Sequence, residues 1–217
     1  MPPPPPPPGP TVFVVDDDAA IRKAVSRLLR SAGFAVAAFA SPSDFLAQYD
    51  PASPGCLVLD LAMPGFDGLR LQTTLRETGS RLPIIFLTGQ GDVSKSVQAM
   101  KHGAFDFFTK PVTGKDLLTA IRAAIEKDAD ARWEHAQLSE IRERLDTLTR
   151  REREVLEHVV AGKLNKQIAD DLGITQATVK MHRARVMAKM KVESVAELAC
   201  LTERCGIRGT NSLKSAA

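Results

Sequence analysis

Five short apolar runs, separated by amphipathic segments, occupy the first half of the chain. They are TVFVV (11–15), FAVAAF (34–39), CLVLD (56–60), LPIIFLT (82–88) and AFDFF (104–108). Near-continuous apolar strands suit a parallel sheet that is covered by helices on both faces. The alternation predicts an α/β domain over residues 11–125, with a doubly wound five-stranded parallel sheet and right-handed crossovers.

The first half of the chain also contains residues that are typical of helix ends. Ser41 and Thr113 each precede a segment with the pattern of an N-cap, and Ser41 is followed by proline at the first helical position. Gly33, Gly79 and Gly103 stand where the first, third and fourth helices are expected to end. The signals place one helix after each strand.

The second half of the chain has a helical pattern throughout. Residues 126–148 contain neither proline nor glycine and predict a helical linker. Its apolar seam is too short to establish a coiled coil and favours docking on a neighbouring domain; it consists of Leu138, Ile141, Leu145 and Leu148. Residues 149–208 predict an all-α domain of four helices, opened by a capping box at Thr149 and broken at Gly173.

Length and composition limit the remaining possibilities. The 217 residues, 44% of them hydrophobic, suffice for two modest domains. No apolar run approaches the ~20 residues that span a bilayer, and the proline-rich start has no signal-peptide pattern. We therefore expect a cytoplasmic protein with no membrane partner, a disordered tail over 1–10 and a flexible tail over 209–217. The three cysteines show no CxxC pairing and predict reduced thiols.

Polar residues stand at the carboxyl ends of the predicted strands. Asp16-Asp17-Asp18 follows the first run, Asp60 ends the third, Thr88 ends the fourth, and Lys110 follows the fifth. Ligands bind beyond the carboxyl ends of strands in open α/β sheets, so these side chains are expected to converge. Crowded carboxylates repel one another, and a hard divalent cation with oxygen ligands, Mg²⁺, would relieve that repulsion.

Such a site suggests phosphoryl transfer to Asp60. A cation beside the carboxylate neutralises charge on the incoming phosphoryl oxygens, Lys110 supplies a second positive charge, and the Thr88 hydroxyl can donate a hydrogen bond. Each element has a simpler alternative when taken alone. The aspartate triplet is equally consistent with a helix N-cap, Lys110 with a solvated loop, and Thr88 with a turn.

The first half resembles the receiver domain of bacterial two-component response regulators. The resemblance is carried by VVDDD (14–18), LVLDLAMPGFDG (57–68), IIFLTG (84–89) and FDFFTKP (105–111). It implies a flavodoxin-like sheet with Asp60 as the phosphorylation site. It further implies Mg²⁺ ligation by Asp17, Asp60 and the Ala62 carbonyl, with Asp16 helping through water.

Three further expectations come from the same resemblance. Thr88 and Phe107 would form the switch pair, Lys110 would pair with the phosphoryl group, and the Lys110–Pro111 bond would be cis. Phe107 also has a simpler reading, because an aromatic residue on such a strand is most often part of the core.

Positive charge is concentrated in the second half. Residues 163–191 hold seven basic and two acidic residues, whereas residues 1–125 hold 12 and 11. A basic helix that follows a glycine turn can enter the major groove of DNA, although a solvated face of a small bundle has the same composition. The candidate DNA contacts are Asn165, Lys166, Thr175, Thr178, Lys180, Arg183 and Lys189.

Residues 148–190, LTRREREVLEHVVAGKLNKQIADDLGITQATVKMHRARVMAKM, resemble the LuxR-type helix-turn-helix domain. In that pattern Asn165 and Lys166 contact phosphates. Together the two halves resemble response regulators of the FixJ and NarL type. This implies a transcription factor whose Asp60 receives a phosphoryl group from a sensor histidine kinase. Its further partners would be promoter DNA (double-stranded) and RNA polymerase.

Two mechanisms of activation stay open at this point. Phosphorylation would pair two receivers through residues 93–108 into a homodimer, or release the DNA-binding domain from inhibition. Two other classes of protein are also consistent with parts of the pattern. A phosphohydrolase with an aspartate nucleophile usually carries a second acid where this chain has Ala62, and a phosphorylation-independent DNA binder would not need the acids. We expect no enzymatic activity beyond Mg²⁺-dependent self-phosphorylation and dephosphorylation at Asp60.

Overall fold

A computed structural model describes residues 9–63, 68–89 and 93–207 of the chain. The chain divides after Arg132 into two compact units. The predicted tails lie outside the described residues except for Gly9 and Pro10, as do Pro64 to Asp67 of the third-strand motif.

The first unit is built on a five-stranded parallel sheet, as predicted. Its strands are β1 (Thr11–Val15), β2 (Ala35–Phe39), β3 (Gly55–Asp60), β4 (Ile84–Thr88) and β5 (Asp106–Thr109). They lie in the order β2-β1-β3-β4-β5. The order reverses direction between β1 and β3, and ligands bind at such a switch point. Val15 pairs with Leu59, so the next residues along these strands, Asp16 and Asp60, lie beside each other.

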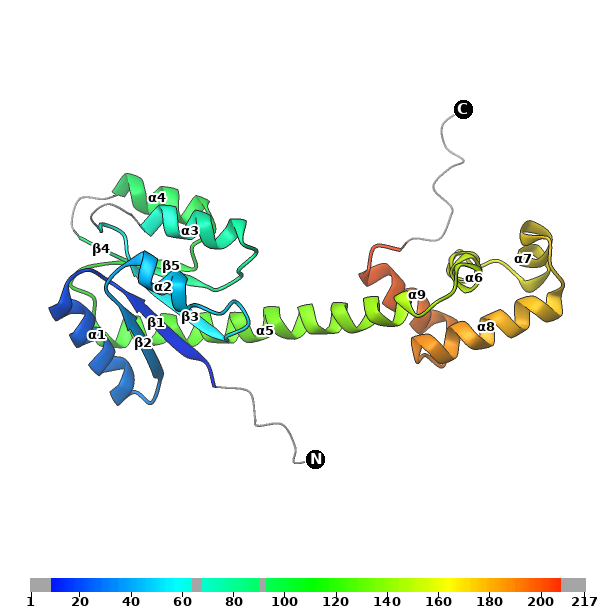
Figure 1. The fold of residues 1–217 in the computed structure, drawn as a ribbon, viewed down its shortest axis with the longest axis horizontal. Coiled ribbons are helices and arrows are strands. Elements are labelled where there is room, and N and C mark those ends of the chain that lie inside the picture. The colour runs from blue at the N-terminus through cyan, green and yellow to red at the C-terminus, as the bar shows by residue number, and fades with distance from the viewer. Residues whose placement is uncertain (1–8, 64–67, 90–92, 208–217) are drawn as a thin grey trace. The chain divides into compact units, whose positions relative to one another are not determined.

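Helices cover both faces of this sheet (Figure 1). They are α1 (Ala19–Ser31), α2 (Pro42–Gln48), α3 (Gly68–Glu77), α4 (Val93–Lys101) and α5 (Gly114–Asp146). Apolar residues of α1 and α5 pack on one face, and those of α2, α3 and α4 pack on the other. Because each face of the sheet is covered, its strands are almost wholly apolar.

The predicted helix signals agree with the structure. The Ser41 hydroxyl accepts a hydrogen bond from the Asp44 amide, with Pro42 at the first helical position. Gly33, Gly79 and Gly103 follow α1, α3 and α4 with φ between 77° and 88°. A glycine in that conformation ends a helix without a steric penalty.

The helix α5 differs from expectation, because it joins the predicted fifth helix and the predicted linker into one element of 33 residues. Nothing in its interior breaks a helix. Ile141, Leu145 and Leu148 are buried, at 4, 4 and 7% exposure, in the core of the second unit. The predicted docking of the apolar seam is therefore confirmed for these three residues.

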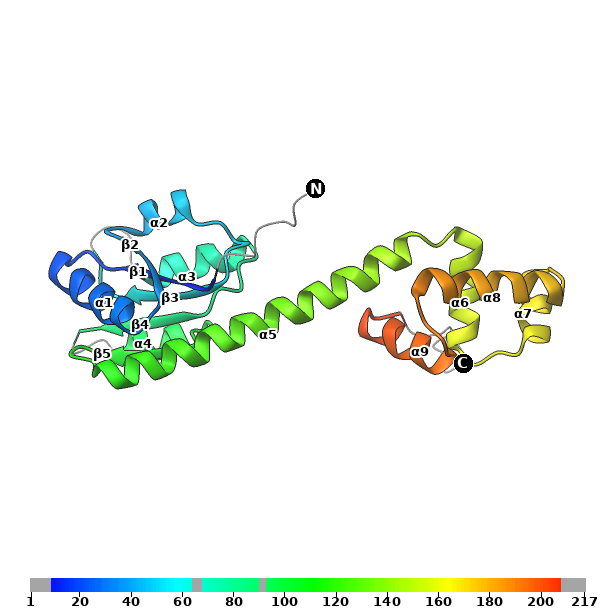
Figure 2. The same cartoon turned by 90° about the horizontal axis from the view of Figure 1, so that it is seen from below.

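The second unit is entirely helical in its described residues. Beyond α5 it contains α6 (Arg150–Val160), α7 (Asn165–Leu172), α8 (Gln176–Met190) and α9 (Val195–Arg204). The predicted capping box is present at Thr149 and Glu152, and Gly173 turns the chain between α7 and α8 with φ 63°. The helix α8 packs against α6 and α7 (Figure 2). Within residues 9–63, 68–89 and 93–207, no helix is both long and apolar enough to cross a bilayer.

Candidate functional site

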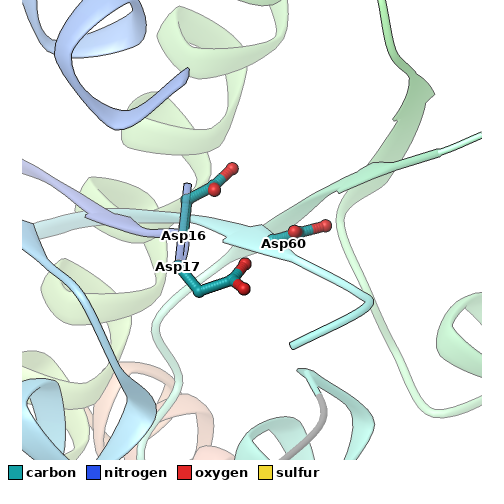
Figure 3. Close-up of side chains that lie close together, drawn as sticks. All are labelled: Asp16, Asp17 and Asp60. Atoms are coloured by element: carbon teal, nitrogen blue, oxygen red, sulfur yellow. The ribbon is translucent and has the colours of Figure 1, made fainter. Parts of the chain in front are cut away.

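Three carboxylates meet at the switch point of the sheet (Figure 3). Asp16 and Asp17 follow β1, and Asp60 is the last residue of β3. One oxygen from each side chain lies within 4.8 Å of the others. Asp16 and Asp60 are buried, at 2 and 6% exposure, whereas Asp17 is exposed. Three oxygen donors from two neighbouring strands form a group that could hold a hard divalent cation.

Lys110 completes this cluster from the loop after β5. Its ammonium lies 2.8 Å from Asp16 Oδ2 and 3.2 Å from Asp60 Oδ2. The backbone amide of Lys110 donates to the Thr88 carbonyl at 2.7 Å, and the Lys110–Pro111 bond is cis, as expected. The loop after β5 therefore places the Lys110 ammonium against the carboxylates of Asp16 and Asp60.

The charges in this cluster are strongly coupled. Burial raises the pKa of Asp60, although the neighbouring Lys110 ammonium opposes the rise. Burial disfavours the charge on Lys110, but hydrogen bonding to Asp16 and the charges of Asp60 and Asp16 raise its pKa overall. Lys110 is therefore held as a cation by the two carboxylates.

The third aspartate has a different role from the first two. Asp18 is the N-cap of α1, where its side chain accepts from Ala20 and Ile21 amides at 2.7 and 3.2 Å. These two backbone hydrogen bonds lower the pKa of Asp18. The N-cap reading thus holds for Asp18, while Asp16 and Asp17 are left free for the acidic cluster.

Arg22 was not predicted as part of this site. Its Nη1 donates to the backbone carbonyls of Asp16 at 2.7 Å and Asp17 at 3.3 Å. The amide of Asp18 also donates to Asp16 Oδ1 at 2.8 Å. Arg22 thus fixes the backbone of the acidic loop from one turn inside α1. The only sequence signal is a basic residue close after the aspartates, which is too common to be diagnostic.

The remaining receiver candidates lie around the cluster. The Ala62 amide donates to Asp60 Oδ1 at 3.3 Å. Thr88 is 1% exposed, and its hydroxyl donates to the Gly89 carbonyl at 3.2 Å. Phe107 lies on the neighbouring strand and is 38% exposed, so the simpler reading of a core aromatic is wrong.

The second candidate surface is formed by α7 and α8. Lys166, Thr175 and Lys180 are exposed. Thr175 is the N-cap of α8 and accepts from the Thr178 amide at 3.1 Å. Arg183 Nη1 donates to Asn165 Oδ1 at 2.9 Å, which joins the middle of α8 to the start of α7. Lys166 and Lys180 are thus exposed cations, whereas Thr175 and Arg183 form hydrogen bonds within and between the two helices.

Lys189, also predicted to contact DNA, has partners within its own unit. Its ammonium donates to Glu152 Oε2 at 2.6 Å and to the Thr147 carbonyl at 2.9 Å. Glu152 is only 2% exposed. Removing the Lys189 ammonium would leave Glu152 as a buried carboxylate without its cation, which is costly. Lys189 therefore stabilises the second unit.

Comparison with known proteins identifies both units. Residues 12–122 match the response regulator receiver domain, and residues 146–202 match the bacterial regulatory proteins of the luxR family. Response regulator protein TodT of Pseudomonas putida is 46% identical over 188 residues, which cover 87% of this chain and 83% of TodT. Transcriptional regulatory protein FixJ of Bradyrhizobium diazoefficiens is 41% identical over 191 residues, covering 88% of this chain and 93% of FixJ.

Solved structures give the same relationship. The response regulator StyR aligns with a TM-score of 0.83 and 44% identity, covering 90% of this chain and 98% of StyR. Full-length FixJ from B. japonicum aligns with a TM-score of 0.57 and 40% identity, covering 91% of this chain and 98% of that one.

Proposed function

Because this chain belongs to the response regulators that join a receiver domain to a LuxR-type DNA-binding domain, we propose that Asp60 is its phosphoryl acceptor and that phosphorylation controls its binding to DNA. The observation that carries the proposal is the convergence of Asp16, Asp17, Asp60 and Lys110 at one end of the sheet. The proposed domains are a receiver (11–125), a linker (126–148) and a DNA-binding domain (149–208).

In the transfer itself, the carboxylate of Asp60 reacts with a phosphorylated donor. A carboxylate oxygen attacks the phosphorus of a phosphohistidine on a sensor kinase, and the phosphorus–nitrogen bond breaks with its electrons left on the histidine. The product is an acyl phosphate on Asp60. Lys110, already within reach of Asp60 at 3.2 Å, would pair with the added negative charge.

The acidic cluster fits Mg²⁺ as the cofactor. Three carboxylates face one ammonium, which leaves an excess of negative charge among oxygen ligands. Asp17, Asp60 and the Ala62 carbonyl would hold the cation, with Asp16 contributing through water. When bound, Mg²⁺ would neutralise charge on the phosphoryl oxygens. Arg22 supports this arrangement, because it fixes the backbone that carries Asp16 and Asp17.

The switch would pass through Thr88 and Phe107. The Thr88 hydroxyl, which donates to Gly89 in this structure, would turn to donate to a phosphoryl oxygen. Phe107 would then leave its exposed position and turn inward. Such a change alters the surface formed by α4 and β5, through which two receivers would pair as a homodimer.

The DNA-binding unit would place α8 in the major groove of promoter DNA. Lys180, Arg183 and the threonines of its first turn would face the bases and phosphates, while Asn165 and Lys166 would contact the backbone. RNA polymerase and the sensor kinase are the other partners proposed, and a protein that binds promoters in a bacterium works in the cytoplasm.

The acceptor is tested with acetyl phosphate and Mg²⁺, followed by intact mass and sedimentation. We expect one added phosphoryl group and a shift to dimer. Both should be absent in Asp60→Asn and with a chelator, and both should persist in Asp130→Asn, which alters an exposed aspartate of α5. An equal shift to dimer in Asp60→Asn would defeat the proposed switch. Steady turnover of a small phosphoester after removal of residues 149–217 would instead indicate a phosphohydrolase.

The DNA surface is tested with Lys180→Ala and Arg183→Ala. A residue that reads a base should cost ~1–3 kcal/mol and relax selectivity at one position, whereas a phosphate contact should weaken all sites and lower the salt slope by about 1. Lys23→Ala removes an exposed charge from α1 and serves as the control. Unchanged binding in both α8 variants would show that α8 is not the recognition helix.

A further inference from the structure

A cavity of about 260 Å³ lies at the amino-terminal end of β4, and we call it the basal cavity. It is bordered by the end of α3, the loop before β4, the end of α4 and the middle of α5. Figures 1 and 2 show these helices around β4 and β5. Asp60 lies at the carboxyl end of β3, whereas the basal cavity lies at the amino end of the neighbouring strand β4. The basal cavity is therefore separate from the acidic cluster.

Three cations line the basal cavity. They are Arg76, Arg81 and Lys127, and none of the described lining residues is acidic. The Lys127 ammonium lies 5.3 Å from the centre of the Phe105 ring, which also lines the cavity. A concave surface with cations of one sign attracts anions, because its walls focus their field.

The walls beneath these cations are apolar. Leu75, Leu82 and Ile84 are 3, 6 and 6% exposed and line the basal cavity beside Pro83. Its volume lies just below the ~300–1,000 Å³ that is usual for small-molecule sites. A cavity of this size suits a small molecule with an apolar body rather than a segment of polypeptide.

Gln72 places an unpaired buried acceptor beside the basal cavity. It is 4% exposed and lines the cavity, and its Nε2 donates to the Ala99 carbonyl at 3.1 Å. Its Oε1 is buried and has no hydrogen-bond partner among the described residues. Buried acceptors are normally paired, so this oxygen would accept a hydrogen bond from a donor group on a ligand once the Gln72 side chain turns toward the basal cavity.

We propose that the basal cavity binds a small organic anion that has an apolar body and a hydroxyl group. The carboxylate or phosphate of the ligand pairs with the arginines at the rim, the body covers the apolar wall, and the hydroxyl donates to Gln72 Oε1. Such a ligand contacts α3, α4 and α5 together. Its occupancy biases receiver pairing through α4 and β5, a consequence that rests on the proposed function, whereas binding does not.

The test is calorimetric titration of the full-length protein with three matched probes. They are 6-hydroxyhexanoate, hexanoate without the hydroxyl, and 1,6-hexanediol without the charge. We expect affinity to fall in that order. The largest amide and side-chain NMR shifts should fall at Gln72, Leu82, His102 and Phe105. Binding of the diol as tightly as the two anions, or shifts confined to other regions, would overturn the proposal.

Two sets of variants assign the contacts. Arg76→Gln with Arg81→Gln should weaken hexanoate binding about tenfold and leave the diol unchanged, whereas Arg30→Gln on α1 should change neither. Gln72→Met should remove the advantage of 6-hydroxyhexanoate over hexanoate; where that variant fails to fold, the arginine pair still decides. Unchanged hexanoate binding in the arginine pair contradicts the proposal, as does binding of hexaglutamate in place of the small anions.

Binding to the basal cavity can be tested independently of phosphorylation. Asp60→Asn is expected to bind 6-hydroxyhexanoate with the affinity of the unaltered protein, because the basal cavity lies at the opposite ends of the strands from Asp60. Failure of the acetyl phosphate experiment would therefore leave the binding result standing. Conversely, loss of binding only in the arginine pair would leave the proposed acceptor role of Asp60 intact.

Discussion

Lys110 is the residue on which the charge balance of the acceptor site depends. It pairs with Asp16 at 2.8 Å and Asp60 at 3.2 Å, two carboxylates that come from different strands. Without it, buried Asp16 and Asp60 would face each other uncompensated, and the pKa of Asp60, already raised by burial, would rise further. The same ammonium that stabilises the resting site can therefore neutralise a phosphoryl group without a large rearrangement.

Glu152 has a comparable role in the second unit. It is 2% exposed, pairs with Lys189 at 2.6 Å and accepts from the Thr149 amide at 2.9 Å. The hydrogen bond from Lys189, followed by that from Thr149, lowers the pKa of Glu152 below its usual 4.5. A carboxylate whose folded pKa is lowered stabilises the fold above its unfolded pKa, and this stability is lost as the pH falls through the folded pKa.

We therefore expect Glu152→Gln to lower the free energy of unfolding of the second unit by about 2 kcal/mol at pH 7. The difference from the unaltered protein should stay constant down to about pH 4.5 and shrink below it. Urea unfolding followed by the methyl NMR signals of Val155 and Leu156 measures it. Glu143→Gln, at an exposed site on α5, is the control. A difference that does not change with pH would show that the charge on Glu152 is not responsible.

The two lysines show what a sequence can reveal about single residues. The approach of Lys110 to Asp60 could be predicted, because the carboxyl ends of parallel strands meet at one edge of a sheet. Lys189 could not be placed, since its partner Glu152 stands 37 residues earlier on another helix. Helical periodicity indicates which face a residue occupies but not which neighbour that face meets.

Among the elements, α5 is held against the start of β3 by hydrogen bonds of two of its residues, Asp128 and Arg132, which also form an ion pair with each other. Asp128 is 2% exposed, accepts from the Gly55 amide at 2.9 Å and pairs with Arg132 at 2.7 Å. Arg132 also donates to the carbonyls of the loop before β3, at 2.6 Å from Ser53 and 2.9 Å from Ala52. The pair thus holds the helix against the amino-terminal edge of the sheet.

Gly55, at the start of β3, is the residue whose backbone amide donates to Asp128 of α5. Its φ is 148°, and a Cβ there would lie 1.8 Å from the Thr11 carbonyl oxygen, so only glycine fits. The backbone amide of Gly55 is buried with Asp128 as its acceptor. A buried amide without an acceptor is costly, which makes Asp128 part of the structure of β3 as well as of α5.

Asp128→Ala is expected to destabilise the first unit by about 3 kcal/mol, because it leaves the Gly55 amide and the Arg132 Nε without their acceptor and removes the carboxylate that pairs with the guanidinium. Urea unfolding followed by methyl NMR signals of Leu57 and Ile85 in the sheet provides the measurement. Asp130→Asn alters an exposed aspartate two residues away and should leave the midpoint unchanged. Equal midpoints for the two variants would mean that the contact contributes nothing to stability.

The kinds of element were more predictable than their limits. The family, the five-stranded parallel sheet and the helical second half are confirmed. The last apolar run predicted a strand over 104–108, but β5 occupies Asp106–Thr109 because its pairing with β4 begins at Asp106. Hydrogen bonding to a neighbour sets the ends of a strand, and hydrophobicity alone does not report it. The join between the predicted fifth helix and the linker was missed for a similar reason: no residue marks it.

At the scale of the whole molecule, the proposed mechanism requires a surface through which two receivers pair. The helix α4 and the strand β5 pack against each other and carry exposed apolar side chains. These are Val97, Met100 and Phe107, at 50, 42 and 38% exposure. Pairing would bury them and bring two copies of α8 to neighbouring half-sites about one helical turn apart on DNA.

Val97→Glu places a charge on this surface, at the most exposed of its three apolar residues. We expect it to accept a phosphoryl group from acetyl phosphate as the unaltered protein does, yet to remain monomeric, because pairing would bury a carboxylate without a partner. The dissociation constant of the phosphorylated dimer should rise at least about tenfold, and DNA affinity should fall with it. Intact mass and sedimentation on the same sample separate the two effects. Lys23→Glu, which changes an exposed site on α1, should still dimerise. If Val97→Glu pairs as well as Lys23→Glu, the receivers meet through another face, and release of the DNA-binding unit becomes the better account of activation.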